Sequence, residues 1–311
     1  MIEYTSNREW SRDLQHLGTS WTLRRVIRAP LGVGVYAAAV SFVMLRLVPG
    51  GWGSSSGVFS LLGVILSLIL AFRTNTAYER WWEGRTRWGE LVNHSRNLAI
   101  QLDAALPAGD RGSRPAYARL IGNFALALSG HLRGRVDGDL LTPTPPGEAA
   151  VTGPGGLESG HVPAHLARAI VARVHDDLRD GSLDATVVVL IKPHTQALLE
   201  IVGACERIRN TPIPFSYSVS IKLFIVLYAA ILPVGLALEY GYLGVPLVML
   251  IVFALLGLEL MAEEIEDPFG LDCNDLPTGT LAAMIRSDVS ELLGIAEAEP
   301  EPAVADYSKR S

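Results

Sequence analysis

Residues 58–88 read VFSLLGVILSLILAFRTNTAYERWWEGRTRW, and this stretch decides the fold because an apolar run passes without a break into polar sequence. The apolar part, Val58–Phe72, is shorter than the roughly 20 residues that a helix needs to cross a bilayer core of about 30 Å. Its helical pattern continues beyond Phe72. We therefore predict one long helix that crosses a membrane and extends past it.

Three further apolar runs have the length of membrane-crossing helices. They lie at Pro30–Val48, Val219–Leu238 and Tyr242–Leu260. The chain of 311 residues is 49% hydrophobic and only 19% charged, whereas soluble domains carry about a quarter charged residues. Four apolar runs, joined in pairs by short loops, predict four transmembrane helices rather than the buried helices of a soluble protein.

Lysine and arginine are unevenly distributed around these four runs. Arginines precede the first run and follow the second, and a lysine opens the third: Arg8, Arg12, Arg24, Arg25, Arg28, Arg73, Arg80, Arg85, Arg87 and Lys222. The short connections at Pro49–Ser56 and Glu239–Gly241 carry neither residue type. Because basic residues favour the cytosolic side of a membrane, we expect both termini and the central region to be cytosolic.

The apolar runs divide the chain into segments. We expect a cytosolic N-terminal segment at 1–29, followed by two transmembrane helices at 30–72. A cytosolic helical domain follows at 73–218, with a flexible loop at 137–160, and two more transmembrane helices lie at 219–262. The chain then continues with an acidic segment and a cytosolic helix at 263–296 and a disordered tail at 297–311. Apolar residues at helical spacing predict cytosolic helices at 77–102, 116–132, 163–178, 183–208 and 279–294. The sequence thus predicts an all-α membrane protein whose second helix continues into a cytosolic bundle.

The motifs of common enzymes are absent from the sequence. It contains no GxSxG, P-loop or HExxH pattern, so we expect a protein that is not an enzyme. The two cysteines, Cys205 and Cys273, are far apart and form no CxxC pair. The closest histidines, His161 and His165, flank Pro163 and have no Cys, Asp or Glu at ligand spacing, which disfavours a metal site. We also expect no nucleic-acid partner.

One apolar stripe on the second helix is a candidate functional surface. Val64, Leu68 and Phe72 recur every fourth residue, so they share one face that drifts by about 40° per step. The stripe either packs against another helix or, repeated in several subunits around one axis, forms an apolar constriction that gates a pore by excluding water. The residues that follow fit a membrane-interface belt of aromatic and basic side chains: Arg73, Asn75, Tyr78, Arg80, Trp81 and Trp82.

A second candidate is the acidic stretch GLELMAEEIEDPFGLDCNDLP at Gly257–Pro277. It contains seven acidic residues and no basic one: Glu259, Glu263, Glu264, Glu266, Asp267, Asp272 and Asp275. Hard cations such as calcium prefer several such oxygen ligands. The alternative is a solvated acidic face that also caps the next helix.

Several motifs together resemble the bestrophin family. They are FRTNTAYERWWEGRTRW at Phe72–Trp88, IEDPFGLDCNDLP at Ile265–Pro277, YTS at Tyr4–Ser6 and CERIRNTPIPFSYS at Cys205–Ser218. The similarity extends from the N-terminus to about Leu293, and it is strongest to the bacterial branch, which lacks the long C-terminal region of eukaryotic members.

The resemblance implies a homopentamer in the bacterial inner membrane with one central ion pathway. The second membrane helix of each subunit lines a narrow neck, and the matching positions are Val64, Leu68 and Phe72. A further constriction at the cytosolic mouth falls within residues 183–191, with Val189 as the candidate.

The resemblance also bears on calcium. Animal bestrophins bind it in an acidic clasp after the Pro-Phe-Gly turn, and Asp272 and Asp275 stand at matching positions. Leu271, Cys273 and Asn274 replace other acids of that run. We therefore expect no calcium-dependent activation and no required cofactor.

The function expected from these features is a passive channel for small monovalent ions, with anions such as chloride as the family default. The proposed neck carries no charge, so a monovalent-cation channel of the same architecture stays open. Two alternatives of another class are a secondary carrier and a membrane-anchored scaffold. A carrier is disfavoured because the helix pairs show no repeat and no acidic residue lies mid-span.

Overall fold

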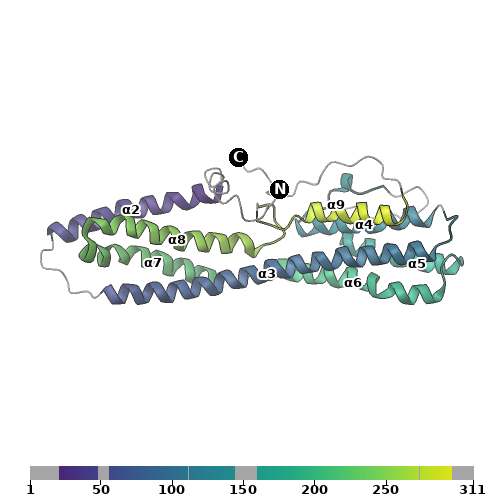
Figure 1. Cartoon of the computed structure of the whole chain (residues 1–311), viewed down its shortest axis with the longest axis horizontal. Helices are drawn as coiled ribbons and strands as arrows, with labels where there is room; N and C mark the ends of the chain where they lie inside the picture. The colour runs from purple at the N-terminus through teal and green to yellow at the C-terminus, as the bar shows by residue number, and fades with distance from the viewer. Residues whose placement is uncertain (1–20, 48–55, 111, 144–159, 273, 296–311) are drawn as a thin grey trace, which may run out of the picture. The chain divides into compact units, whose positions relative to one another are not determined.

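The computed structural model describes residues 21–47, 56–110, 112–143, 160–272 and 274–295, with the side chains of 21–26 and 56 excepted. In these ranges every regular element is helical (Figure 1), as the sequence predicts. The α-helices are α2 (Trp21–Leu47), α3 (Ser56–Ala105), α4 (Ser113–Leu132), α5 (Val162–Arg179), α6 (Ala185–Asn210), α7 (Phe215–Tyr240), α8 (Gly244–Glu266) and α9 (Thr278–Leu292), with short 3-10 turns η1 (Gly138–Leu140) and η3 (Gly241–Leu243).

The described part of the chain falls into two compact units. The first consists of α2, α7, α8 and the part of α3 that ends at Tyr78. The second consists of the rest of α3, from Glu79, together with α4, α5, α6 and α9. The single long helix predicted from residues 58–88 is therefore present, and it contributes to both units.

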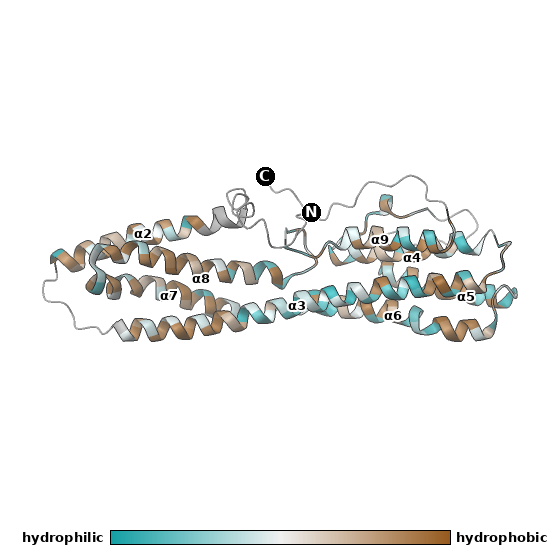
Figure 2. Cartoon of the chain, viewed as in Figure 1, coloured by the Kyte–Doolittle hydropathy of each residue, from teal (hydrophilic) through white to brown (hydrophobic). Residues whose placement is uncertain are grey.

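Apolar residues dominate the helices of the first unit. Figure 2 shows them concentrated along α2, α7 and α8. The helices are held at short distances where small residues meet larger ones, as is common between membrane helices. A Cβ atom on Gly34 of α2 would lie 2.6 Å from the sulfur of Met249 on α8. The buried core of this unit includes Leu66 and Leu70 from α3, Ile225 and Leu232 from α7, and Val248 and Val252 from α8.

Four stretches among the described residues are long and apolar enough to cross a membrane: Ile27–Leu47, Gly57–Ala105, Ala185–Asn210 and Phe215–Glu266. The last stretch holds both α7 and α8, which are separated by a turn at Gly241 with φ of 59°. The third is α6, whose Leu198, Ile201 and Val202 are buried in the core of the second unit. We therefore place the four membrane crossings in α2, α7, α8 and the first part of α3.

Two sequence predictions require correction. The fourth membrane run was expected to begin at Tyr242, but that residue lies in η3 and α8 begins at Gly244. The positive φ of Gly241 explains the difference, because the chain turns there before it can resume a helix.

The predicted loop at 137–160 is also partly ordered. Residues 138–140 form η1, and the Asn123 amide exchanges two hydrogen bonds of 2.8 and 2.9 Å with the backbone of Thr142. Residues 144–159 of that loop and the predicted tail at 297–311 lie outside the described residues.

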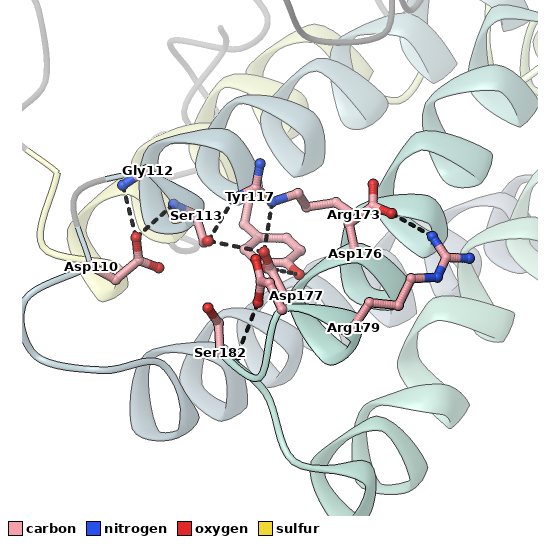
Figure 3. Close-up of polar contacts among 10 residues, drawn as sticks. Asp110, Gly112, Ser113, Tyr117, Arg173, Asp176, Asp177, Arg179 and Ser182 are labelled. Carbon is pink, nitrogen blue, oxygen red and sulfur yellow. Dashed lines mark hydrogen bonds and ion pairs between the residues drawn. The ribbon is translucent and has the colours of Figure 1, made fainter.

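The second unit has a large core of its own, to which Trp88, Tyr117, Phe124 and Phe269 each contribute a fully buried side chain. Helix α4 packs against both α5 and α9. A buried polar network fixes the start of α4 against the end of α5 (Figure 3). Asp177 accepts hydrogen bonds from the Tyr117 hydroxyl at 2.7 Å and the Ser113 hydroxyl at 3.1 Å. Burial and the hydrogen bond to Asp177 raise the pKa of Tyr117, so its hydroxyl stays protonated as a donor.

Candidate functional site

The predicted neck stripe faces away from the rest of its own subunit. Val64, Leu68 and Phe72 are 66%, 57% and 60% exposed. The buried residues of the same part of α3 are Leu66, Leu70, Arg73 and Ala77. With 3.6 residues per turn, this buried set lies on the side of α3 opposite the stripe. No described helix of the first unit covers the stripe, which excludes packing against α2, α7 or α8 of the same subunit.

The exposed face of α3 is broader than the three predicted residues. Leu61 and Ile65 are also exposed and extend the same apolar surface. No charged residue occurs between Gly57 and Phe72. This face can therefore exclude water or contact lipid, but it does not attract an ion by charge.

Arg73 directly follows the stripe and points the opposite way. Its side chain is 1% exposed, and its Nη2 atom lies 2.8 Å from Glu266 Oε2. Its Nε atom lies 3.7 Å from Glu259 Oε2, and both carboxylates belong to α8. The second oxygen of Glu266 accepts a hydrogen bond from the backbone N–H of Ile213 at 2.8 Å.

Arg73 was expected to belong to a membrane-interface belt, and the structure shows that its side chain is buried within the subunit rather than exposed. Its guanidinium lies beside the buried carboxylate of Glu259 and the half-buried carboxylate of Glu266. The pairing ties α3 to α8 and holds the stripe on the outward face.

Three motif residues after Arg73 make contacts that hold the second unit together, whereas Tyr78 and Trp82 are exposed. The Arg80 guanidinium donates to the carbonyl oxygens of Thr211 at 2.6 Å and Ile208 at 2.5 Å, which caps the C-terminal end of α6. Trp81 Nε1 donates to the carbonyl oxygen of Asn274 at 3.0 Å. A Cβ atom on Gly84 would lie 3.1 Å from the Phe269 ring, so glycine permits the close approach of the Asp-Pro-Phe-Gly turn to α3. The two most specific sequence motifs thus contact each other within the second unit.

The two acidic residues predicted as a calcium-clasp remnant differ in their surroundings. Asp275 is buried, and its Oδ2 atom accepts the backbone N–H of Asp272 at 2.6 Å. The Asp272 side chain is exposed. Burial, together with the nearby charges of Asp272 and Asp267, raises the pKa of Asp275 to about 7, although the hydrogen bond from Asp272 opposes this shift. The hydrogen bond to the Asp275 side chain therefore closes the turn. The absence of calcium-dependent activation stays a prediction.

The candidate for the second constriction lies near the start of α6. Val189 is 69% exposed, its neighbour Leu190 is also exposed, and Ile191 is buried. Asp184 caps this helix end by accepting the backbone N–H of Thr186 at 2.7 Å. Like the stripe on α3, Val189 is not covered by its own subunit in the described part of the chain.

Comparisons with known proteins agree on one family. The family model for bacterial and fungal bestrophin proteins matches residues 1–291. A voltage-dependent anion channel-forming protein of Ralstonia nicotianae is 33% identical over 257 residues, which cover 81% of this chain and 80% of that protein. A protein of the same description from Escherichia coli is 29% identical over 264 residues, or 85% of each chain.

Solved structures show the same fold. The crystal structure of a bacterial bestrophin homologue from Klebsiella pneumoniae matches with a TM-score of 0.78 at 24% identity, covering 88% of this chain and 100% of that one. An alanine variant of the Klebsiella protein matches with a TM-score of 0.77 at 26% identity, over the same shares of the two chains.

Proposed function

Since this chain belongs to the bacterial and fungal bestrophin family, we propose that it forms an anion channel. Two similar proteins, from Ralstonia nicotianae and Escherichia coli, are described as voltage-dependent anion channel-forming proteins. The chain is a membrane protein and not an enzyme. Chloride is the anion that we assign to the channel, and transport is passive.

The ion path in this proposal runs along the axis of a homopentamer. The observation that carries it is the uncovered apolar stripe of Val64, Leu68 and Phe72 on α3. Five copies of the stripe around one axis form a hydrophobic neck that excludes water unless it widens. The Arg73–Glu266 pair supports this arrangement because it turns the opposite side of α3 toward α8.

The preference for one sign of charge comes from outside the neck in this proposal. Because no charge lies between Gly57 and Phe72, the neck selects by dehydration, and polar groups elsewhere along the path set the preferred sign of charge. Reversal potentials of the purified protein under asymmetric salt distinguish an anion channel from a monovalent-cation channel of the same architecture.

The second unit and both termini are assigned to the cytosol, and the membrane is the bacterial inner membrane. The support is the excess of lysine and arginine on one side: the short connections at Pro49–Ser56 and Glu239–Gly241 carry neither, and Arg46 near the end of α2 is the exception. The second constriction is assigned to residues 183–191, with Val189 as the narrowing residue because it is strongly exposed on a single subunit. Neither calcium nor another cofactor is required for conduction in this proposal.

The test is ion flux through purified protein in liposomes. The triple substitution V64A/L68A/F72A widens the neck and is expected to raise the flux above that of the wild type. The matched control L223A/F224A/V226A removes the same three residue types from exposed positions of α7. An unchanged flux and selectivity in the α3 triple variant contradict the neck assignment.

The same assay separates the alternative classes. A channel passes ions down a gradient far faster than a carrier does, and a scaffold passes none. Flux at carrier rates, or no flux from a protein that is correctly assembled, contradicts the channel proposal as a whole.

A further inference from the structure

Three side chains from three different helical elements converge in the second unit. His131 lies in the last turn of α4, His161 immediately precedes α5, and Glu206 lies on α6. The Nε2 atoms of His131 and His161 lie 2.6 and 2.8 Å from the same oxygen, Oε1 of Glu206. One possible ligand atom of each residue lies within 4.8 Å of the others, and no other such group of three occurs among the described residues.

The backbone around this cluster holds its members in place. Arg209 donates to the carbonyl oxygen of His131 at 2.8 Å, which fixes the end of α4. His161 is the N-cap of α5, and its Nδ1 atom accepts the backbone N–H of Ala164 at 3.2 Å. This contact turns the other nitrogen of the His161 ring, Nε2, toward Glu206. The two imidazole rings have centroids 4.6 Å apart and are tilted by 32°.

The cluster is partly open to solvent, with all three side chains between one quarter and two fifths exposed. A cation can therefore reach it from water. Burial alone would raise the pKa of Glu206, but hydrogen bonds from His131 and His161 outweigh this effect and lower it. The carboxylate is thus ionised at neutral pH and able to act as a ligand.

We propose that His131, His161 and Glu206 form a binding site for one divalent transition-metal ion, with Zn²⁺ as the best match. Two imidazole nitrogens and one carboxylate oxygen are a common ligand set for Zn²⁺, and water completes the tetrahedron. Ligand bonds of about 2.0–2.2 Å place tetrahedral ligand atoms roughly 3.3 Å apart. The two nitrogens therefore move away from the Glu206 oxygen by less than about 1 Å, which side-chain rotation supplies.

Zn²⁺ binding changes the hydrogen bonds of the cluster. Both histidines use Nε2 as the ligand, so the metal replaces the two contacts to Glu206. A neutral His161 then carries its proton on Nδ1 and no longer accepts from Ala164. Zn²⁺ binds the two imidazoles only in their neutral form, because a protonated ring nitrogen has no lone pair to offer. The site links α4, α5 and α6, so bound Zn²⁺ stabilises the folded second unit.

This inference does not depend on ion conduction, and its test does not use it. The full chain is purified in detergent, treated with EDTA and titrated with Zn²⁺ alone against a competing chromophoric chelator. We expect one Zn²⁺ per subunit and a higher melting temperature with Zn²⁺ than with EDTA. The variants H131A and E206Q are expected to bind at least 10-fold more weakly and to lose the thermal shift.

The control variant is H175A, which removes an exposed histidine of α5 outside the cluster. It is expected to bind Zn²⁺ like the wild type. E206Q preserves the size of the Glu206 side chain, and its circular dichroism spectrum reports whether the fold is retained. The proposal is overturned if the wild type binds no stoichiometric Zn²⁺, if folded E206Q binds like the wild type, or if H175A weakens binding equally.

Discussion

The buried Arg73 on α3 and the half-buried Glu266 at the end of α8 form an ion pair with 2.8 Å between Nη2 and Oε2. Phe72, the residue before Arg73, is 60% exposed. Neighbouring residues on a helix are 100° apart, so an inward Arg73 fixes the rotation of α3 and leaves the neck stripe outward. The pair therefore connects the packing of one subunit with the surface proposed to line the pore.

Replacing Arg73 by methionine is expected to destabilise the protein by about 3–5 kcal/mol, because the buried Glu259 and the half-buried Glu266 both lose their cation. Thermal unfolding in detergent measures the effect. The control is Lys222→Met, which breaks the exposed Lys222–Glu263 pair and is expected to cost about 0–1 kcal/mol. Equal effects of the two substitutions would show that Arg73 does not hold α3 in place.

Gly84→Val is expected to destabilise the second unit by about 1–3 kcal/mol, because a side chain at this position meets Phe269 and Leu276. Chemical denaturation checks the change. Gly89→Val provides the comparison on the same helix, since a Cβ atom there meets only the mobile end of Arg85 at 3.4 Å. If the two valine variants were equally stable, the close approach at Gly84 would not be a constraint.

Asp275→Asn is expected to have an effect on stability that depends on pH. Burial raises the pKa of Asp275 to about 7 from an ordinary value near 3.8, so the folded protein binds this proton more tightly than the unfolded chain does. The wild type then loses stability as the pH rises from about 4 to about 7, by at most about 1.4 kcal/mol per pH unit.

The asparagine variant cannot ionise, so its stability relative to the wild type is expected to increase between pH 5 and pH 8. Melting temperatures of the two proteins across this range give the comparison. A difference that stays constant with pH would contradict the burial of an ionisable Asp275.

The sequence carries enough information to predict the helices and the common face of three residues on α3. An apolar run such as Val58–Phe72 reveals a membrane helix by its length and composition alone, and a four-residue spacing places Val64, Leu68 and Phe72 on one face. Both inferences use only residues that are close in the sequence.

The features that were missed depend on residues far apart in the sequence. Arg73 meets Glu259 and Glu266 of α8, and only a pairing of the two helix ends would have revealed this. In the sequence, the histidine nearest to His161 is His165, and that pair indicated no metal site. The structure instead brings His161 to His131 and Glu206. Local periodicity contains no signal for either contact.

Cysteine modification at Leu68 shows most directly whether the outward stripe of α3 borders the ion path. Cys273 is first replaced by serine, while Cys205 can remain because it is buried and burial raises the pKa of its thiol to about 12. L68C and the control L223C on α7 are then treated with a cationic methanethiosulfonate reagent during recording in planar bilayers. Mass spectrometry confirms the modification.

We expect a ring of cationic groups at position 68 to change the conductance and to shift the reversal potential toward that of anions. The same reagent at position 223 should change neither quantity. A fully modified L68C protein whose conductance and reversal potential are unchanged would contradict the claim that this face of α3 lines the pore.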